Sequence, residues 1–227
     1  MVDCPSHSTL AQRIADLRQT IPAHVQLIAV SKTVPASLIR EAYAAGIRDF
    51  GESRLQEAIA KQLELQDLKD IVWHFIGHLQ SNKVKPALEH FQWFHSVDSW
   101  ALAERMNQLA TACEHKPKVC LQVKLRDDPS KFGWTQPQLE EALPQLQTLE
   151  HLDLRGLMTI LPLGLSPSQQ LSVFEDLKSL AQTLQFQSNG HLTLPELSMG
   201  MSSDYPLAIQ AGATMIRLGT ILFGQRK

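Results

Sequence analysis

The feature that most constrains this sequence is a repeated alternation between short apolar runs and stretches with helical periodicity. Eight runs have the length and residue types of strands: 24–31, 47–51, 71–77, 91–97, 118–125, 152–160, 194–200 and 214–224. Every run except the last is clearly followed by a helical pattern, at 36–45, 53–66, 81–89, from Asp98 onward, 136–147, 167–184 and 205–211. Strands that alternate with helices indicate βαβ units and a parallel sheet. Eight such units favour a single-domain (β/α)8 barrel over the alternative, an open doubly wound sheet.

The start of the chain adds one helix before the first strand. Apolar residues recur at helical spacing between residues 10 and 21, and Thr9 with Gln12 has the spacing of a capping box. Ser53 with Gln56 repeats that signature, so Ser53 is expected to cap the helix that follows the second strand. No repeat, low-complexity tract or linker divides the 227 residues, which are therefore expected to form one domain.

Charge and cysteine content narrow the class of protein. The 21 Lys and Arg residues nearly balance the 23 Asp and Glu residues, for a net charge of −2, which argues against a dedicated nucleic-acid-binding protein. Cys4, Cys113 and Cys120 are odd in number and form no CxxC pair, so a reducing compartment is expected. The sequence contains no stretch of signal-peptide type and no apolar run long enough to span a membrane. We therefore expect a cytoplasmic protein with no nucleic-acid or membrane partner.

The first predicted strand ends in the candidate residue with the most distinctive chemistry. Lys32 directly follows the run LIAVS, and in a barrel the carboxyl ends of the strands carry the functional groups. A partly desolvated lysine amine loses proton affinity and can form a Schiff base with an aldehyde. The alternative is a strand-end lysine whose amine simply extends into solvent.

Two polar turns follow the last two strands. SMGMSS, residues 198–203, and RLGT, residues 217–220, are rich in Gly, Ser and Thr, where barrels frequently bind phosphate through backbone N–H groups. The candidate ligand-binding residues of these turns are Met199, Gly200, Ser202, Arg217, Gly219 and Thr220. The alternatives are that the glycines only permit tight turns, that a serine only caps a helix, and that Arg217 forms a salt bridge inside the barrel.

Other polar residues are weaker candidates. His74 and His78 lie four residues apart but lack the HExxH pattern of a zinc site. Glu52 could act as an acid or base, although a carboxylate that favours the start of a helix is the simpler interpretation. The basic and aromatic loop that contains Lys124, Arg126 and residues 131–134 could contact a ligand or partner, but a solvated loop is the default. The aromatic residues of the third and fourth runs are expected in the core: Trp73, Phe75, Trp93 and Phe94.

Seven motifs occur in order over nearly the whole chain: AVSKT (29–33), FGESR (50–54), WHFIGHLQSNK (73–83), KFGW (131–134), GLMTI (156–160), LSMGMSSD (197–204) and IRLGTILFG (216–224). Together they resemble the pyridoxal 5′-phosphate homeostasis protein family. The resemblance implies a barrel of fold-type III, like the N-terminal domain of alanine racemase.

The resemblance also implies a cofactor and its contacts. Lys32 would carry pyridoxal phosphate as an imine, Arg217 would lie against the pyridine nitrogen, and Ser202, Gly219 and Thr220 would hold the phosphate. The common form of the second motif is FGEN, and this chain has Ser53 in place of the asparagine. Since both residues are good N-caps, we expect little effect on the fold, but any direct contact of that amide with the cofactor is in doubt.

Three functions remain to be compared. The first is a carrier that takes part in intracellular pyridoxal phosphate homeostasis, with possible delivery to apo-enzymes and with no catalytic residue or turnover of its own. The second is a fold-type III amino-acid racemase or decarboxylase, and the third is a class I aldolase that uses Lys32. Fold-type III enzymes append a β-rich domain, for which the 227 residues leave no room, so a monomeric carrier is favoured. An arginine cannot protonate the ring nitrogen at neutral pH, which agrees with a carrier because it weakens the cofactor as an electron sink.

Overall fold

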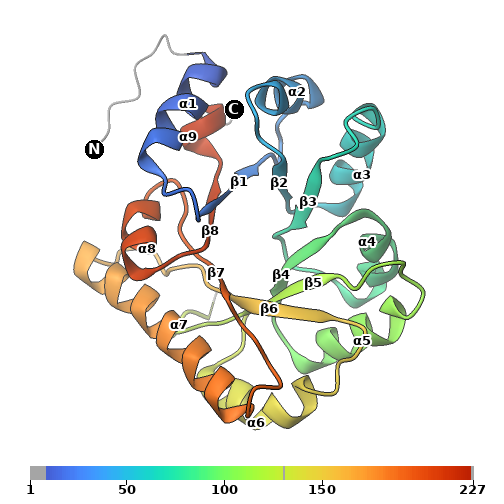
Figure 1. Ribbon diagram of the computed structural model, residues 1–227, viewed down its shortest axis with the longest axis vertical. Coiled ribbons are helices and arrows are strands. Elements are labelled where there is room, and N and C mark those ends of the chain that lie inside the picture. The colour runs from blue at the N-terminus through green and yellow to red at the C-terminus, as the bar shows by residue number, and fades with distance from the viewer. Residues whose placement is uncertain (1–8, 130, 226–227) are drawn as a thin grey trace.

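A computed structural model of the protein describes residues 9–129 and 131–225. Within them the strands form a closed parallel barrel in the order of the sequence, β1 to β8, with β8 paired to β1 (Figure 1). The strands are β1 Gln26–Val30, β2 Asp49–Glu52, β3 Val72–Phe75, β4 Trp93–Val97, β5 Lys118–Gln122, β6 Asp153–Met158, β7 Glu196–Ser198 and β8 Met215–Leu218. This architecture confirms the predicted (β/α)8 barrel. Cys4 lies outside the described residues, and Cys113 and Cys120 are free thiols.

Helices surround the barrel, as expected for βαβ units. They are α1 Leu10–Thr20, α2 Ala36–Ala44, α3 Leu55–Glu64, α4 Val84–His90, α5 Trp100–Ala110, α6 Gln136–Leu146, α7 Pro167–Gln187, α8 Tyr205–Ala211 and α9 Thr220–Phe223, with the 3-10 turn η1 Ser81–Lys83 before α4. The extra N-terminal helix is confirmed, and the Thr9 hydroxyl accepts a hydrogen bond from the Gln12 N–H at its start. No helix in the described part of the chain is both long and apolar enough to cross a membrane.

The first and last helices lie side by side (Figure 1). The Arg13 side chain on α1 donates a hydrogen bond from Nε to the carbonyl of Leu222 on α9, at 2.7 Å. Helix α9 begins within the turn at residues 219–220, with Gly219 as its N-cap. The N-terminal helix therefore supports the last turn of the barrel as well as closing the ring of helices.

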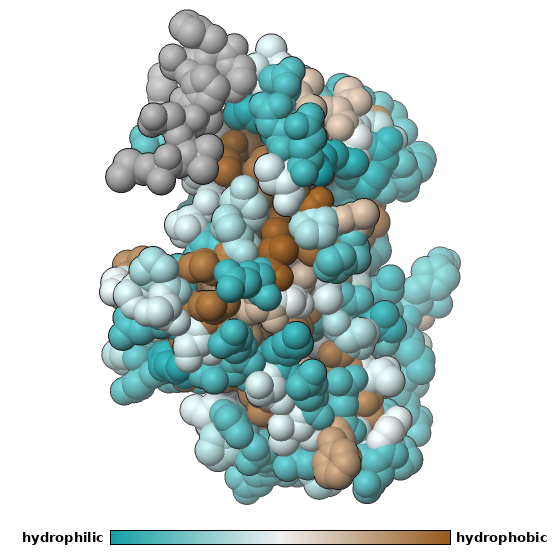
Figure 2. Space-filling view, turned by 60° about the vertical axis from the view of Figure 1, so that its left-hand side comes forward, coloured by the Kyte–Doolittle hydropathy of each residue, from teal (hydrophilic) through white to brown (hydrophobic). Residues whose placement is uncertain are grey.

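Two apolar clusters stabilise the fold. The larger one lies between the strands and the helices and includes the predicted core residues Trp73, Phe75 and Phe94. The smaller one is inside the barrel and consists of Ile28, Trp93, Cys120, Met158 and Met215. Hydrophilic residues cover most of the face seen in Figure 2, and hydrophobic ones appear between them only in small groups.

Strand register decides which side chains share the barrel interior. Ile28 pairs with Arg217, and His74 pairs with Trp93, so each polar residue points to the same side as its apolar neighbour. All four are buried. Polar side chains therefore stand among apolar ones inside the barrel, and each needs an internal hydrogen-bond partner.

Candidate functional site

The predicted site residues come from neighbouring strands at one end of the barrel. Ala29 of β1 pairs with Leu218 of β8, so the turn that contains Lys32 and the turn at residues 219–220 follow two adjacent strands at their carboxyl ends. Ser202 lies in the loop after β7, the strand next to β8. The fold thus brings together three segments that are far apart in the sequence, at the end where barrels place their sites.

Lys32 lies half-buried in a tight turn after β1. Its neighbour Ser31 is fully buried, and Thr33 has φ of 61°, which is an uncommon conformation for a β-branched residue. The Thr33 N–H donates a hydrogen bond to the Glu57 carboxylate. Such strained turns persist where the surrounding contacts hold them, so the support of this turn is part of the site.

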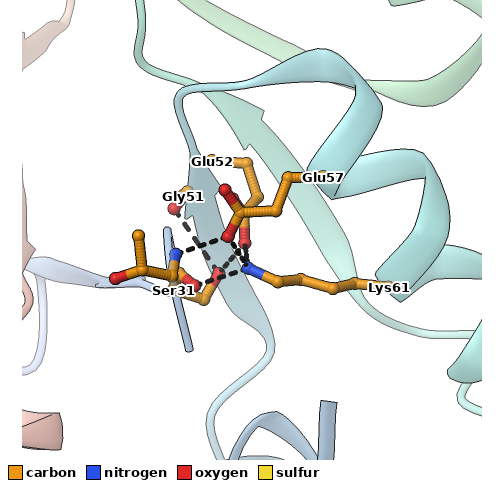
Figure 3. A network of polar contacts seen from close by, with 6 residues as sticks. Ser31, Gly51, Glu52, Glu57 and Lys61 are labelled. Carbon is orange, nitrogen blue, oxygen red and sulfur yellow. Dashed lines mark hydrogen bonds and ion pairs between the residues drawn. The ribbon is translucent and has the colours of Figure 1, made fainter. Parts of the chain in front are cut away.

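A network of charged side chains supplies that support (Figure 3). The Lys61 ammonium donates to the Ser31 carbonyl at 2.7 Å, to Glu52 Oε1 at 2.8 Å and to Glu57 Oε1 at 2.6 Å. The Ser31 hydroxyl donates to the same Glu52 oxygen at 2.7 Å. We call these four residues, Ser31, Glu52, Glu57 and Lys61, the lysine clamp. It fixes the backbone on both sides of Lys32.

The interpretation of Glu52 as a helix-start carboxylate is wrong. Glu52 is the last residue of β2 and is fully buried, and its Oε2 has no hydrogen-bond partner among the described residues. Burial raises the pKa of its carboxyl, against the opposing effects of Lys61 and Ser31. Its role in this structure is to bind Lys61 and the Ser31 hydroxyl.

The predicted capping role of Ser53 is also wrong. Helix α3 begins at Leu55 with Arg54 as its N-cap, and no side chain caps it. The backbone of Ser53 packs directly on Gly77, where a Cβ atom would stand 2.3 Å from the Ser53 carbonyl oxygen. This close approach holds Ser53 outside the helix. The change from the common asparagine therefore removes no cap from α3.

Arg217 lies inside the barrel and is almost fully buried. Its Nη1 donates to the Ser198 hydroxyl at 2.7 Å and its Nη2 to the carbonyl of Thr159 at 2.9 Å. Neither partner is charged, so the alternative of a salt bridge does not describe these contacts. Burial lowers the pKa of Arg217 to about 10, and the guanidinium therefore stays protonated at neutral pH.

The turns after β7 and β8 contact each other through one hydroxyl. The Ser202 oxygen accepts long hydrogen bonds from the N–H groups of Gly219, at 3.3 Å, and Ile221, at 3.4 Å. Thr220 between them is exposed. A hydroxyl, two backbone N–H groups and an exposed threonine are all suited to an anion.

Gly200 and Met199 have structural roles in the same loop. Gly200 has φ of +94°, and a Cβ atom there would stand 2.7 Å from the Ala208 Cβ, so this position requires glycine. Its carbonyl accepts the Arg217 N–H at 2.9 Å. Met199 is fully buried in the apolar core. Of these two candidates, Gly200 lies where its backbone supports Arg217, whereas the Met199 side chain is part of the core.

The weaker candidates divide between the interior and the surface. His74 is fully buried, whereas His78 binds Asp98 and stacks on the exposed ring of Phe132 with ring centres 3.9 Å apart. In the basic loop, Trp134 is buried and donates from its indole N–H to the carbonyl of Val97 at 3.0 Å. Among the described residues, no cluster of three or more His, Cys, Asp or Glu side chains could hold a metal ion.

The contacts of several polar residues in the interior were not predicted from the sequence. For Lys61 and Glu57 the sequence does contain a signal. Glu57 precedes Lys61 by four residues on α3, the spacing of an ion pair along a helix, and Lys61 lies among the buried residues of that helix. His95 lies between Phe94 and Ser96, and Ser198 lies between Leu197 and Met199, so nothing in the sequence shows which partners they have. Those partners come from other strands.

Comparison with known proteins agrees with this geometry. Residues 6–227 match the family described as alanine racemase, N-terminal domain. A protein of Synechocystis sp. named pyridoxal phosphate homeostasis protein is 52% identical over 212 residues, which cover 93% of this chain and 96% of that protein. A protein of the same name from Pseudomonas aeruginosa is 45% identical over 229 residues, 96% of each chain.

Solved structures show the same relationship. PipY of Synechococcus elongatus, in a structure described as having PLP bound, superposes with a TM-score of 0.92 at 56% identity, over 95% of this chain and 100% of that one. The structure of PipY without PLP superposes with a TM-score of 0.93. Alanine racemase of Clostridium difficile, with a TM-score of 0.73 and 14% identity, shares the fold, and the match covers 96% of this chain and 56% of that one.

Proposed function

Because this chain belongs to the pyridoxal phosphate homeostasis proteins within the alanine racemase N-terminal domain family, we propose that it binds pyridoxal phosphate at the carboxyl end of the barrel. The observation that carries the proposal is the convergence of three kinds of donor on adjacent strand ends. Lys32 offers an amine, Arg217 a guanidinium, and the loops after β7 and β8 offer hydroxyl and N–H groups.

The residues present fit the chemistry of this cofactor. Pyridoxal phosphate carries an aldehyde that reacts reversibly with an amine, a ring nitrogen that accepts a hydrogen bond, and a phosphate dianion. Lys32 is half-buried in a held turn, Arg217 has further N–H donors beyond its two internal contacts, and the Ser202 hydroxyl is bound only by long hydrogen bonds. Gly200 keeps the loop close to α8, where a Cβ atom would clash.

We assign one role to each group. Lys32 is the covalent attachment point of the aldehyde, and Arg217 donates to the ring nitrogen. Ser202, Gly219 and Thr220 hold the phosphate, while Met199 and Gly200 shape the loop that carries Ser202. Arg217 is held by Ser198 and Thr159, so contacts within the protein set its direction.

Arg217 gives no support for versatile electron-sink catalysis, although the racemase alternative is compatible with the same arrangement. A group that keeps its own proton at neutral pH cannot protonate the ring nitrogen, and Arg217 is such a group, since its pKa is about 10. The curated relatives are named as homeostasis proteins. We therefore propose intracellular cofactor homeostasis, with delivery to apo-enzymes, by a monomer in the cytoplasm and without turnover of amino acids. Stereospecific racemisation that depends on Lys32 would instead support the enzyme alternative.

Reduction with borohydride tests the attachment point. After incubation with pyridoxal phosphate, reduction should fix a pyridoxyl group on the peptide that contains Ser31, Lys32 and Thr33, as read by mass spectrometry. Lys32→Ala should lose this product and keep the fold, whereas Lys83→Ala, in a surface turn, should retain it. A main product at any other lysine contradicts the assignment.

The phosphate contacts have a separate test. Thr220→Val keeps the shape of the side chain and removes its exposed hydroxyl. Loss of one charge-assisted hydrogen bond, about 1.5–3 kcal/mol, should weaken pyridoxal phosphate binding by roughly 10- to 100-fold. Pyridoxal without phosphate should be released from the unmodified protein more readily still. Equal retention of pyridoxal and its phosphate ester would leave the two turns with a structural role alone.

A further inference from the structure

A chain of hydrogen bonds crosses the barrel interior behind Arg217. The Ser198 hydroxyl, which binds Arg217, also binds His95 Nδ1 at 2.8 Å, and His95 Nε2 binds His74 Nδ1 at 2.9 Å. His74 Nε2 then binds Asp49 Oδ1 at 3.0 Å. We call Arg217, Ser198, His95, His74 and Asp49 the barrel relay. It connects five strands, from β8 through β7, β4 and β3 to the first residue of β2.

The interior of the barrel keeps this relay from water. Ser198, His95 and His74 are fully buried, and only the Asp49 side chain at the amino end is partly exposed. The Trp93 ring stacks on the His74 ring, with centres 5.8 Å apart and planes 9° apart, and lies 5.7 Å from the His95 ring. An apolar ring therefore holds both imidazoles in place, and buried polar groups in such surroundings need every available partner.

The carboxylate at one end and the burial of both imidazoles fix the position of every proton in between. Burial favours neutral histidines and Asp49 only accepts, so each histidine carries its proton on Nε2, and His95 Nδ1 accepts from the Ser198 hydroxyl, whose oxygen accepts from Arg217. His95 then carries its proton on Nε2 and donates to His74 Nδ1. His74 likewise donates from Nε2 to the carboxylate of Asp49, which only accepts. Both histidines are neutral and share one tautomer.

An added proton would break this order. Protonation of His95 would leave Ser198 unable to donate to Nδ1, and protonation of His74 would move the His95 proton to Nδ1 and likewise turn the Ser198 hydroxyl away. Burial lowers the pKa of both histidines, in agreement with the neutral forms. A second donor, the Gln26 amide, reaches the same Asp49 oxygen at 2.7 Å and holds the acceptor end in place.

We propose that His95 and His74 are positioning residues, which act through Ser198 to lock the guanidinium of Arg217 in the orientation that it presents to the ring nitrogen of the cofactor. The orientation toward the ring nitrogen rests on the proposed function, whereas the lock on Arg217 does not depend on the cofactor. An anion at one end and a cation at the other polarise the neutral groups between them in the same direction. The relay thus links the amino end of the barrel to the site at its carboxyl end.

The first test needs no cofactor. In protein labelled with 15N at histidine and arginine, His74 and His95 should each show a protonated Nε2 and an unprotonated Nδ1 at neutral pH. The Nη groups of Arg217 should give separate signals because their rotation is blocked. His95→Phe should average the Arg217 signals. If the phenylalanine ring at position 95 prevents folding, Ser198→Ala replaces this variant and should average them as well. An Nδ1–H tautomer or an imidazolium at either histidine overturns the relay, and so do unchanged Arg217 signals.

The second test uses pyridoxal phosphate labelled with 15N in the ring, at saturation. The ring-nitrogen shift should change in His95→Phe, and the affinity should fall by roughly tenfold, the effect of one hydrogen bond. His95→Asn, whose side-chain oxygen can still accept from Ser198, should restore much of both. His90→Phe, a control at a histidine that binds Gln62 outside the relay, should leave both unchanged.

The two tests separate the two claims. If the wild-type protein binds no pyridoxal phosphate, the proposed function fails, and the Arg217 signals of the first test still decide whether the lock exists. If the cofactor binds but its ring-nitrogen shift is the same in wild type and His95→Phe, the lock does not act on the ligand and the proposal is overturned.

Discussion

The lysine clamp and the barrel relay hold the two ends of the same site by opposite means. The clamp combines two carboxylates, an ammonium and the Ser31 hydroxyl around the Lys32 turn, and its contacts lie between β2, α3 and the segment after β1. The relay behind Arg217 has charged groups only at its ends and neutral groups between them. The site therefore fixes one functional side chain by charge and the other by the direction of hydrogen bonds.

The difference follows from what each network must hold. The Lys32 turn is backbone with an uncommon φ at Thr33, so its support has to reach carbonyl and N–H groups, which Lys61 and Glu57 do. Arg217 is a long side chain in an apolar interior, where another full charge nearby would cost desolvation energy. Neutral donors and acceptors satisfy it without that cost. The two networks should therefore fail in different ways.

The largest effect is expected where a charge of the clamp loses its partner. Lys61→Met leaves the buried Glu52 carboxylate without its counter-charge, and breaking a buried pair in this way costs about 3–5 kcal/mol. The free energy of unfolding, measured in urea at pH 7, should fall by that amount. Arg40→Met, which removes the exposed ion pair with Asp67, is the control and should not change the urea midpoint measurably.

A double variant shows whether charge is the cause. Glu52→Gln removes the second charge, so Lys61→Met combined with Glu52→Gln should be more stable than Lys61→Met alone. If the double variant is less stable than the single one, the clamp contributes packing rather than charge compensation, and the contrast with the relay fails.

A smaller effect is expected in the relay. Ser198→Ala removes one small side chain but leaves Arg217 Nη1 and His95 Nδ1 without their partner, which should cost about 1–3 kcal/mol. Thr159→Val is the matched control, because it removes a buried hydroxyl that binds Val123 and keeps the carbonyl that binds Arg217. It should cost less than Ser198→Ala, as read from the same urea titrations. An equal loss of stability in both variants would show that Ser198 is only one more buried hydroxyl.

Sequence alone predicted the barrel because its cause is local. Each strand is a compact apolar run and each helix has its own periodicity. The number of strand–helix units then indicates a closed barrel. Lys32 and Arg217 could be found for the same reason, since a charged residue next to or inside an apolar run can be recognised in the sequence. The assignment of their ligand-binding roles is still a prediction.

The supports of these residues could not be predicted, because each depends on several strands at once. The capping signature of Ser53 and Gln56 is local, and it failed because Gly77, from the next strand loop, packs on the Ser53 backbone. In the sequence, Glu52 resembles a carboxylate at the start of a helix. Only the fold brings Lys61, which lies one turn beyond Glu57 on α3, close to Glu52. Side chains that alternate with apolar neighbours on separate strands, as in the relay, give no pattern that a single sequence could show.

The smallest effect is expected in the pH dependence of stability between pH 4.5 and 6.5. Burial raises the pKa of Glu52 above its ordinary 4.5, so the folded state holds this proton more tightly and stability falls as the pH rises through that window. Burial lowers the pKa of His74 and His95 below 6.5, so the unfolded state holds their protons more tightly and stability falls as the pH decreases. Glu52 of the clamp and the two histidines of the relay therefore contribute slopes of opposite sign, while the lowered pKa of Glu57 places its contribution below this window. Urea midpoints across the window should show a slope more positive than wild type in Glu52→Gln and more negative in His74→Gln. A hydrogen bond removed by either substitution shifts the whole curve and leaves its slope unchanged, so slopes that change in the same direction would contradict the division between the two networks.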